Sequence, residues 1–192
     1  MRLVNLGCLA AVGMAAVMAQ DKAIDAGRSS ITVHVGKTGL FSMAGHEHLV
    51  SAPISAGVLA ESGRPHVEFR VDAARMEVQP DPKIDARTQA EIQKDMQEIT
   101  LESAKYPEIV FRSTRVEKQA GERWMVEGTL TLHGVTKQLA LAVMRSGDGF
   151  VSHATIKQTD FGIKPISAAG GAVKVKNELE IDFRIVTRPG LN

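Results

Sequence analysis

The chain has 192 residues, and its 23 Lys and Arg against 22 Asp and Glu give a formal net charge of +1 at neutral pH. This balance, without any block of basic residues, argues against nucleic acid as a partner and against an electrostatic grip on the anionic lipid headgroups of a membrane. The length suits one compact domain rather than two. Cys8 is the only cysteine, which excludes an internal disulfide and a multi-cysteine metal site.

The N-terminus has the features of a secretory signal peptide over residues 1–19. Arg2 supplies a positive start, residues 3–17 form an apolar run too short to span a bilayer comfortably, and Ala19 places a small residue at the cleavage point. A retained N-terminal anchor helix is the alternative. No later segment is long and apolar enough to cross a membrane. We therefore expect residues 20–192 to form one exported, periplasmic domain without stable membrane insertion.

From residue 30 onward, apolar and polar side chains alternate, which indicates strands with one buried face. Pro53 implies an edge or a bulge near the start of the second strand, because proline has no backbone N–H to donate. Turns at residues 133–136 and 147–149 favour antiparallel pairing of the strands on either side. The eight expected strands cover residues 30–35, 50–59, 67–71, 109–116, 124–132, 139–143, 150–158 and 173–185, and the last should be the longest.

One segment breaks this alternation, from Asp85 to about Lys105. Ile92, Met96 and Ile99 fall at positions i, i+4 and i+7, with Glu, Gln and Lys elsewhere, which predicts an amphipathic helix of three or four turns. The helix would be inserted between the third and fourth strands.

Eight alternating strands in one domain predict an all-β fold in which an antiparallel sheet closes into a barrel, since closure removes exposed edges. A barrel of that size either holds one elongated apolar ligand or fills itself with side chains. Only 4% of the residues are aromatic, so the dry face consists mainly of aliphatic side chains. Both interiors are compatible with that composition.

Four stretches of the chain carry a resemblance to a known family, and together they cover roughly residues 25–187. They resemble the YceI-like family of exported lipid-binding proteins, often called polyisoprenoid-binding. The resemblance implies an extended, lipocalin-like barrel with a helix over one side and an interior tunnel for an isoprenoid or other amphiphilic chain. The stretches are RSSITV at 28–33, KYPEIVFRST at 105–114, GTLTLHGVTK at 128–137 and TDFGI at 159–163.

Apolar recognition needs no sharp motif, because each buried CH₂ group contributes about 0.8 kcal/mol wherever the wall is apolar. Candidates for contact with a ligand are therefore the large side chains on the predicted dry face. Each of them would serve equally well as a barrel-core residue without a ligand. The candidates are Val33, Phe69, Phe111, Trp124, Leu130, Leu141, Phe161, Ile181 and Phe183.

His46 and His48 flank Glu47 in a GHEH sequence at the start of the second strand. In an extended backbone both imidazoles point to one side, about 7 Å apart, which suits a shared metal ion. A firm metal site needs three or four ligands, however, and the other histidines lie on separate elements. We interpret the pair as strand-end or cavity-rim residues, and we assign no metal. His133 is interpreted as a turn residue whose ring bonds to the backbone.

Signs of catalysis are few. The chain has no Gly-x-Ser-x-Gly elbow, no phosphate-cradling loop and no paired carboxylates in contrasting settings. We therefore expect a binding protein rather than an enzyme, without a cofactor, whose partner is a lipid-like or isoprenoid-like small molecule that it carries or sequesters. The alternative is a metal- or haem-linked periplasmic accessory protein that uses His46 and His48. Monomer and homodimer both stay open.

Overall fold

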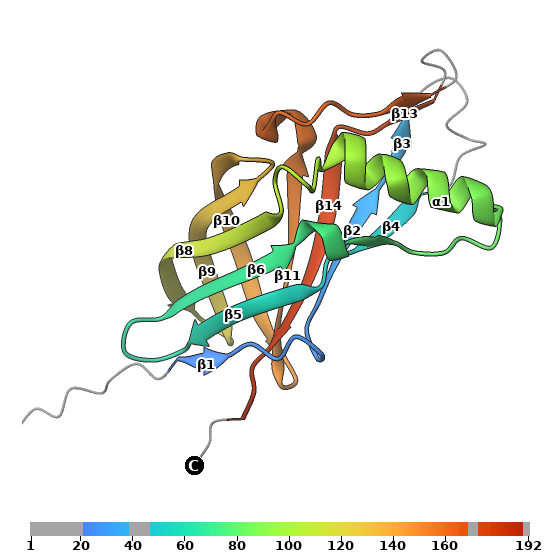
Figure 1. The fold of residues 1–192 in the computed structure, drawn as a ribbon. Helices are drawn as coiled ribbons and strands as arrows, with labels where there is room; N and C mark the ends of the chain where they lie inside the picture. Colours follow the sequence, from blue (N-terminus) through green and yellow to red (C-terminus); the bar gives the residue numbers. More distant parts are fainter. Residues whose placement is uncertain (1–20, 39–46, 169–172, 190–192) are drawn as a thin grey trace, which may run out of the picture.

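The computed structural model describes residues 21–38, 47–168 and 173–189, which fold mainly into antiparallel strands with an α-helix at one end (Figure 1). None of the helices in these ranges has the length and apolar character that crossing a bilayer requires. The strands are β1 (Lys22–Ala23), β2 (Ser30–Val35), β3 (Lys37–Thr38), β4 (His48–Ser51), β5 (Ile54–Ala60), β6 (His66–Asp72), β7 (Glu77–Val78), β8 (Glu108–Gln119), β9 (Arg123–Leu132), β10 (Val135–Ser146), β11 (Gly149–Lys157), β12 (Ser167–Ala168), β13 (Val173–Val175) and β14 (Glu178–Val186). The helical elements are η2 (Ala73–Arg75), α1 (Ala86–Asp95), the π-helical turn η3 (Met96–Thr100) and η4 (Gln158–Phe161).

The main sheet is a curled half-barrel of eleven strands in the order β1-β5-β6-β8-β9-β10-β11-β14-β2-β4-β7. Every pair in it is antiparallel, in agreement with the short turns in the sequence. The curl brings β1 back to β14, since the Asp25 N–H donates to the Val186 carbonyl and the Arg188 N–H donates to the Ala23 carbonyl. The inward side chains form the core.

The expected count of eight strands is wrong for the described residues, partly because two predicted strands are each divided. Pro53 separates β4, which pairs with β2, from β5, which pairs with β6. Proline cannot donate to a ladder, so the chain changes partners there. The predicted last strand is divided at Asn177, whose side chain bonds to Thr159. As a result β13 joins β3 and β12 in a separate small sheet, and the longest strands are β8 and β10, with 12 residues each.

The predicted turn at residues 133–136 is confirmed as a two-residue hairpin, because Leu132 pairs with Val135. His133 and Gly134 both have positive φ, 52° and 73°. Such a turn matches the twist of the flanking strands, and glycine adopts this conformation without steric cost. A methyl group at Gly134 would also lie only 2.7 Å from the Tyr106 ring, so both conformation and space require glycine.

The predicted helix exists but is shorter than expected and ends in a different geometry. α1 begins after Asp85, whose carboxylate accepts hydrogen bonds from the N–H groups of residues 87 and 88. Ile92 and Met96 pack against the core as predicted, whereas Ile99 is 62% exposed. The π-helical turn η3 has more residues per turn than an α-helix, which rotates Ile99 away from the sheet. Leu101, 8% exposed, is buried beyond it.

α1 and η3 are attached to the sheet by glutamine side chains as well as by apolar contacts. Three glutamines spaced four residues apart share one helical face. Their amides bond to backbone groups of η2, β7 and the residues beside them, so the helical segment supplies hydrogen bonds that a sheet edge would otherwise lack. Gln89 donates to the carbonyls of Val78 and Gln79. Gln93 donates to the Met76 carbonyl and accepts from the Val78 N–H, and Gln97 donates to the carbonyls of Ala73 and Met76.

The outer face of the half-barrel carries an aspartate between two histidines from neighbouring strands. Asp182 on β14 accepts from His34 on β2 and from His153 on β11, at 2.9 Å in both cases. The hydrogen bond from His153, followed by that from His34, holds the pKa of Asp182 below its usual 3.8. A group whose pKa is lower in the folded state stabilises the fold above its unfolded-state pKa, and this stabilisation is lost as the pH falls through the folded value.

We expect Gln93→Met to destabilise the protein by about 1–3 kcal/mol, because it leaves the buried Val78 N–H without its acceptor. The matched control is Lys94→Met, one residue along, where the side chain is 66% exposed. The control should change the free energy of unfolding by less than about 0.5 kcal/mol. Urea unfolding of both variants measures the difference. Equal effects would mean that the glutamine face does not anchor the helix.

We expect His153→Ala to raise the pKa of Asp182 toward 3.8, since it removes the largest contribution to the lowered value. The corresponding loss of stability should be fully present above about pH 4 and should disappear as the pH falls through the folded-state pKa of Asp182. A ¹³C NMR titration of the Asp182 carboxyl group measures the shift directly. His66→Ala serves as the control, because His66 pairs with Asp21 and not with Asp182. An unchanged Asp182 titration in His153→Ala would contradict the assignment.

Candidate ligand-binding site

The inner face of the half-barrel encloses an apolar cavity, here called the inner cavity, with a volume of about 80 Å³. It lies where the β5–β6, β8–β9 and β10–β11 hairpins and the end of β14 come together. Strand register explains its lining, because Trp124, Val143, Ser152 and Phe183 are successive cross-strand partners and so share one face. The lining residues are Leu59, Ala60, Glu61, Pro65, His66, Val67, Phe69, Phe111, Val116, Trp124, Val126, Leu141, Val143, Phe150, Val151, Ser152, Phe183 and Ile185.

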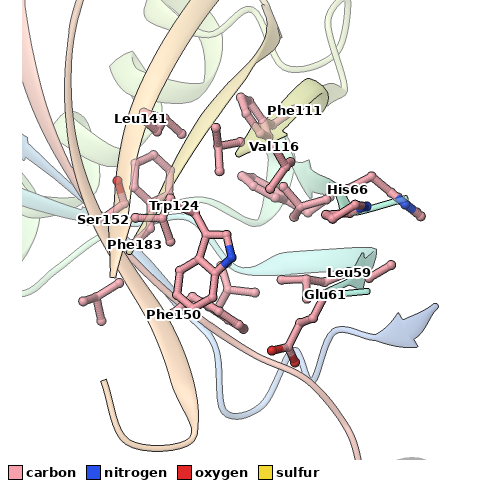
Figure 2. Close-up of a pocket in the computed structure, with 18 residues that line it drawn as sticks. Leu59, Glu61, His66, Phe111, Val116, Trp124, Leu141, Phe150, Ser152 and Phe183 are labelled. Carbon is pink, nitrogen blue, oxygen red and sulfur yellow. The ribbon is translucent and has the colours of Figure 1, made fainter. Parts of the chain in front are cut away.

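Aromatic rings form much of the wall of the inner cavity, although they are scarce in the chain as a whole. Phe69 stacks on Phe111 with ring centroids 5.5 Å apart, and Phe183 lies 6.4 Å from Phe69. Trp124 meets Phe150 edge-on at 5.2 Å. Figure 2 shows the Trp124 indole projecting into the middle of the labelled side chains. Pairs of this geometry add about 0.5–1.5 kcal/mol beyond their buried area, so ring contacts help to stabilise this side of the wall.

A second cavity, here called the helix cavity, lies beneath α1 and has a volume of about 320 Å³. Its apolar wall comes from β2, β4, β7 and β14, and the helical segment covers it with Ile92, Met96 and Leu101. Polar groups also reach it, unlike most of the inner cavity. Those groups are Lys37, His48, Asp95, Thr100 and Gln158.

The two cavities lie at opposite ends of the half-barrel. Leu179 lines the helix cavity, and Phe183 and Ile185 line the inner cavity, all on the same face of β14. At about 3.3 Å per residue, Leu179 and Ile185 are about 20 Å apart. Ile181 lies between them on that face, is 7% exposed, and is in the lining of neither cavity. Core side chains at the level of Ile181 therefore separate the two spaces.

The nine predicted contact residues fall into three groups. Five line the inner cavity, and Val33 lines the helix cavity. Leu130, Phe161 and Ile181 belong to the core and line neither. Phe161 lies in η4, which contacts both β10 and β11 and fills the space beside them. Whether any of the nine contacts a ligand stays a prediction. The five in the inner cavity are Phe69, Phe111, Trp124, Leu141 and Phe183.

The predicted rim pair is only partly within the described residues. His46 lies outside them, and His48 begins β4 and lines the helix cavity. Among residues 21–38, 47–168 and 173–189, no group of three His, Cys, Asp or Glu side chains is arranged to hold a metal ion.

Sequence reasoning missed a set of charged side chains at the open end of the inner cavity. Arg145 forms ion pairs with Glu61 and, at 3.7 Å, with Glu122, and Glu61 also pairs with Lys22 at 3.2 Å. Arg145 continues the inward series of Leu139, Leu141 and Val143 along β10. The strict alternation could therefore have identified it as a cation on the dry face.

A second missed feature joins three of the stretches that carry the family resemblance. His133 bonds through Nε2 to the Glu102 carboxylate at 2.7 Å and through Nδ1 to the Phe161 carbonyl at 3.3 Å, and its ring lies 4.3 Å from that of Tyr106. The predicted bond from the His133 ring to the backbone is thus confirmed. The Glu102 carboxylate and the Phe161 carbonyl are both acceptors, so the His133 ring can donate a hydrogen bond to either of them.

This contact holds two residues in an unfavourable backbone conformation. Glu102 and His133 both have positive φ, 43° and 52°. Such a conformation costs about 1–2 kcal/mol for a residue other than glycine. The His133 side chain is only 11% exposed, so its charge-assisted bond to Glu102 is strong enough to offset part of that cost.

Comparison with known proteins agrees with this architecture. The model of the YceI-like domain matches residues 23–187, which is most of the chain. The chain belongs to the YceI-like family. The resemblance seen in the sequence is thereby confirmed. Among curated YceI-like relatives, a UPF0312 protein of Pseudomonas savastanoi pv. phaseolicola is 35% identical over 98 residues, covering 46% of this chain and 49% of that protein. Protein YceI of Escherichia coli O157:H7 is 39% identical over 74 residues, covering 33% of this chain and 38% of that protein.

The chain spans about half the length, or less, of the curated YceI-like relatives that it matches. Two solved YceI-like folds cover more of it. Burkholderia cenocepacia BcnA has a TM-score of 0.56 at 16% identity and covers 86% of this chain and 99% of its own. A domain from Saccharophagus degradans, described as polyisoprenoid-binding and implicated in plant cell wall breakdown, also has a TM-score of 0.56, at 18% identity, with 88% and 97% covered. At these identities the similarity establishes the fold.

We expect Glu102→Gln to destabilise the protein by about 1–2 kcal/mol, a value reduced from that of a fully buried ion pair because Glu102 is 40% exposed. His133→Asn keeps a residue that tolerates the turn conformation, so the double variant isolates the pairing energy. Glu98→Gln, at a 65% exposed position, is the control and should have almost no effect. Chemical denaturation of the four variants and wild type gives the coupling. Additive effects of Glu102→Gln and His133→Asn would show that the two residues do not interact.

Proposed function

We propose that this protein binds the apolar chain of an isoprenoid-like or other amphiphilic lipid inside the half-barrel, and that it carries or sequesters that lipid after export. The observation that carries the proposal is the lining of the inner cavity, where aromatic and aliphatic side chains predominate and charged groups are confined to the open end. Few functions other than apolar binding use such a space. The description of the Saccharophagus domain as polyisoprenoid-binding supports the same class of ligand.

The volumes of the cavities limit how such a ligand would be held. The inner cavity, at about 80 Å³, is smaller than the 300–1,000 Å³ of typical small-molecule sites, whereas the helix cavity, at about 320 Å³, reaches that range. A long chain that begins in the inner cavity would have to pass Ile181 to use the second space. Each methylene buried on the way contributes about 0.8 kcal/mol, which favours displacing a few core side chains.

The proposal includes two further points: the protein is exported, and it binds its lipid without catalysing a reaction on it. The signal-like segment at residues 1–19 supports export. The sequence has no nucleophile motif, and the titratable groups of the inner cavity lie at its open end and not along its wall. These features favour a carrier that protects an apolar chain from water.

Native mass spectrometry of protein exported to a bacterial periplasm and purified without detergent is the first test. An adduct with the mass of a lipid, released on denaturation and extractable into organic solvent, is the expected result. Denatured protein also reports the mass of the mature chain and thus tests cleavage near residue 19. An adduct of metal mass instead would contradict lipid carriage.

We expect Val143→Phe to weaken binding of geranylgeraniol at least ten-fold, because the added ring occupies the inner cavity. Trp124 is the only tryptophan and lines that cavity, so its fluorescence reports occupancy directly. Met144→Phe is the matched control, since Met144 is the next residue, points outward and is 46% exposed. The control should bind as wild type does. Thermal unfolding of both variants separates lost binding from lost folding, and equal affinities would exclude the inner cavity as the site.

A further inference from the structure

The open end of the inner cavity carries three cations that face inward. Arg145 pairs across the strands with Phe150, Lys118 with Trp124, and Lys22 with Leu59, and each of these partners lines the cavity. Cross-strand partners share a face of the sheet, so all three cationic side chains project to the inner side. We call Lys22, Lys118 and Arg145 the rim cations.

The central rim cation is held by the aromatic wall as well as by carboxylates. The guanidinium carbon of Arg145 lies 4.5 Å from the ring centre of Phe150 and 5.7 Å from that of Trp124. The Lys118 ammonium is 5.8 Å from the Trp124 ring. The Arg145 side chain is 27% exposed, so its charge lies at the boundary between the apolar cavity and solvent. Ring contacts of this kind keep a cation in place without an anionic partner.

Two carboxylates pair with the rim cations, which leaves one positive charge in excess among these five groups. Glu61 bonds to both Arg145 and Lys22, and Glu122 lies 3.7 Å from Arg145. The Glu61 carboxylate shows that a planar anion fits against the Arg145 guanidinium at the edge of the cavity. Asp21 pairs at 3.4 Å with His66 of the cavity lining, so the excess belongs to the five groups around Arg145 and not to the whole mouth.

We propose that the rim binds the anionic headgroup, a carboxylate or a phosphate, of the amphiphile whose chain fills the inner cavity, with Arg145 as its main contact and Glu61 as the group that gives way. The inference rests on the proposed function, since only a tail in the inner cavity places a headgroup at this position. An uncharged headgroup would leave the ion pair of Arg145 and Glu61 in place. An anionic headgroup would replace the Glu61 carboxylate as the partner of Arg145. It would also neutralise the one excess positive charge among the five groups.

The test compares ligands that share a tail and differ in headgroup. Geranylgeranyl monophosphate is compared with geranylgeraniol, and palmitate with hexadecanol, by Trp124 fluorescence at low and at physiological salt. We expect each anion to bind wild type at least ten-fold more tightly than its alcohol, with a difference that shrinks as salt screens the rim. A preference in one pair alone identifies the headgroup as a phosphate or as a carboxylate.

Two variants assign the preference to the rim. Arg145→Met keeps an unbranched side chain over Phe150 and removes the charge, so it should lose the preference for the anion and keep the affinity for the alcohol. Glu61→Gln removes the competing carboxylate and should increase the affinity for the anion several-fold. The double variant Arg145→Met/Glu61→Gln removes both charges of the ion pair. It replaces Arg145→Met in the binding test if that single variant does not fold. Arg184→Met, on the outer face, is the matched control and should bind as wild type does.

Failure of this inference can be told apart from failure of the proposed function. If wild type binds each alcohol as tightly as its anion, or if Arg145→Met leaves the preference unchanged, the rim does not recognise the headgroup and the apolar site stands. If neither member of either pair binds wild type stripped of lipid, the proposed function fails together with the inference.

Discussion

The fold depends on a short backbone contact that keeps the main sheet curled. Residues 22–25 bond on one side to β5 and on the other to the end of β14, so the two flanks of the sheet are joined where the inner cavity opens. This contact buries the inward rows of side chains and also brings Lys22 to Glu61 at the mouth. Without it the sheet would expose an edge, and the apolar face of β5 would meet water.

Different interactions stabilise the two ends of the half-barrel, hydrogen bonds from neutral amides at one end and ion pairs at the other. At one end, glutamine amides attach the helical segment to η2 and β7, and the apolar contacts of Ile92 and Met96 lie beneath it. At the other end, a chain of ion pairs through Glu61 and Arg145 borders the inner cavity. Hydrogen bonds between neutral groups hold at any salt concentration, whereas exposed ion pairs weaken as salt rises. Charge at the mouth of the inner cavity therefore acts in a salt-dependent way, and the helix cavity has charged side chains of its own, Lys37 and Asp95, in its lining.

Much of the strand pattern could be predicted because alternation and turn residues are local signals. The hairpin at His133 and Gly134 follows from residues that accept positive φ, and the inward row of β9 follows from period two alone. The division at Pro53 could not be predicted, because apolar residues continue on both sides while the strand changes partners. Ile99 was misplaced because a π-helical turn depends on tertiary contacts rather than on side-chain period.

The segments that make the family recognisable do not line the inner cavity for the most part. Tyr106, His133 and Phe161 lie in three of the matching stretches, and they meet in a cluster that also fixes Glu102. Their conformational requirements are strict, since the cluster includes two residues with positive φ besides Gly134. The cavity wall needs only apolar side chains of suitable size, which many sequences provide. The family motifs of this fold therefore reflect the contacts that stabilise the half-barrel. The ligand must be inferred from groups outside these motifs, such as Arg145 at the mouth of the inner cavity.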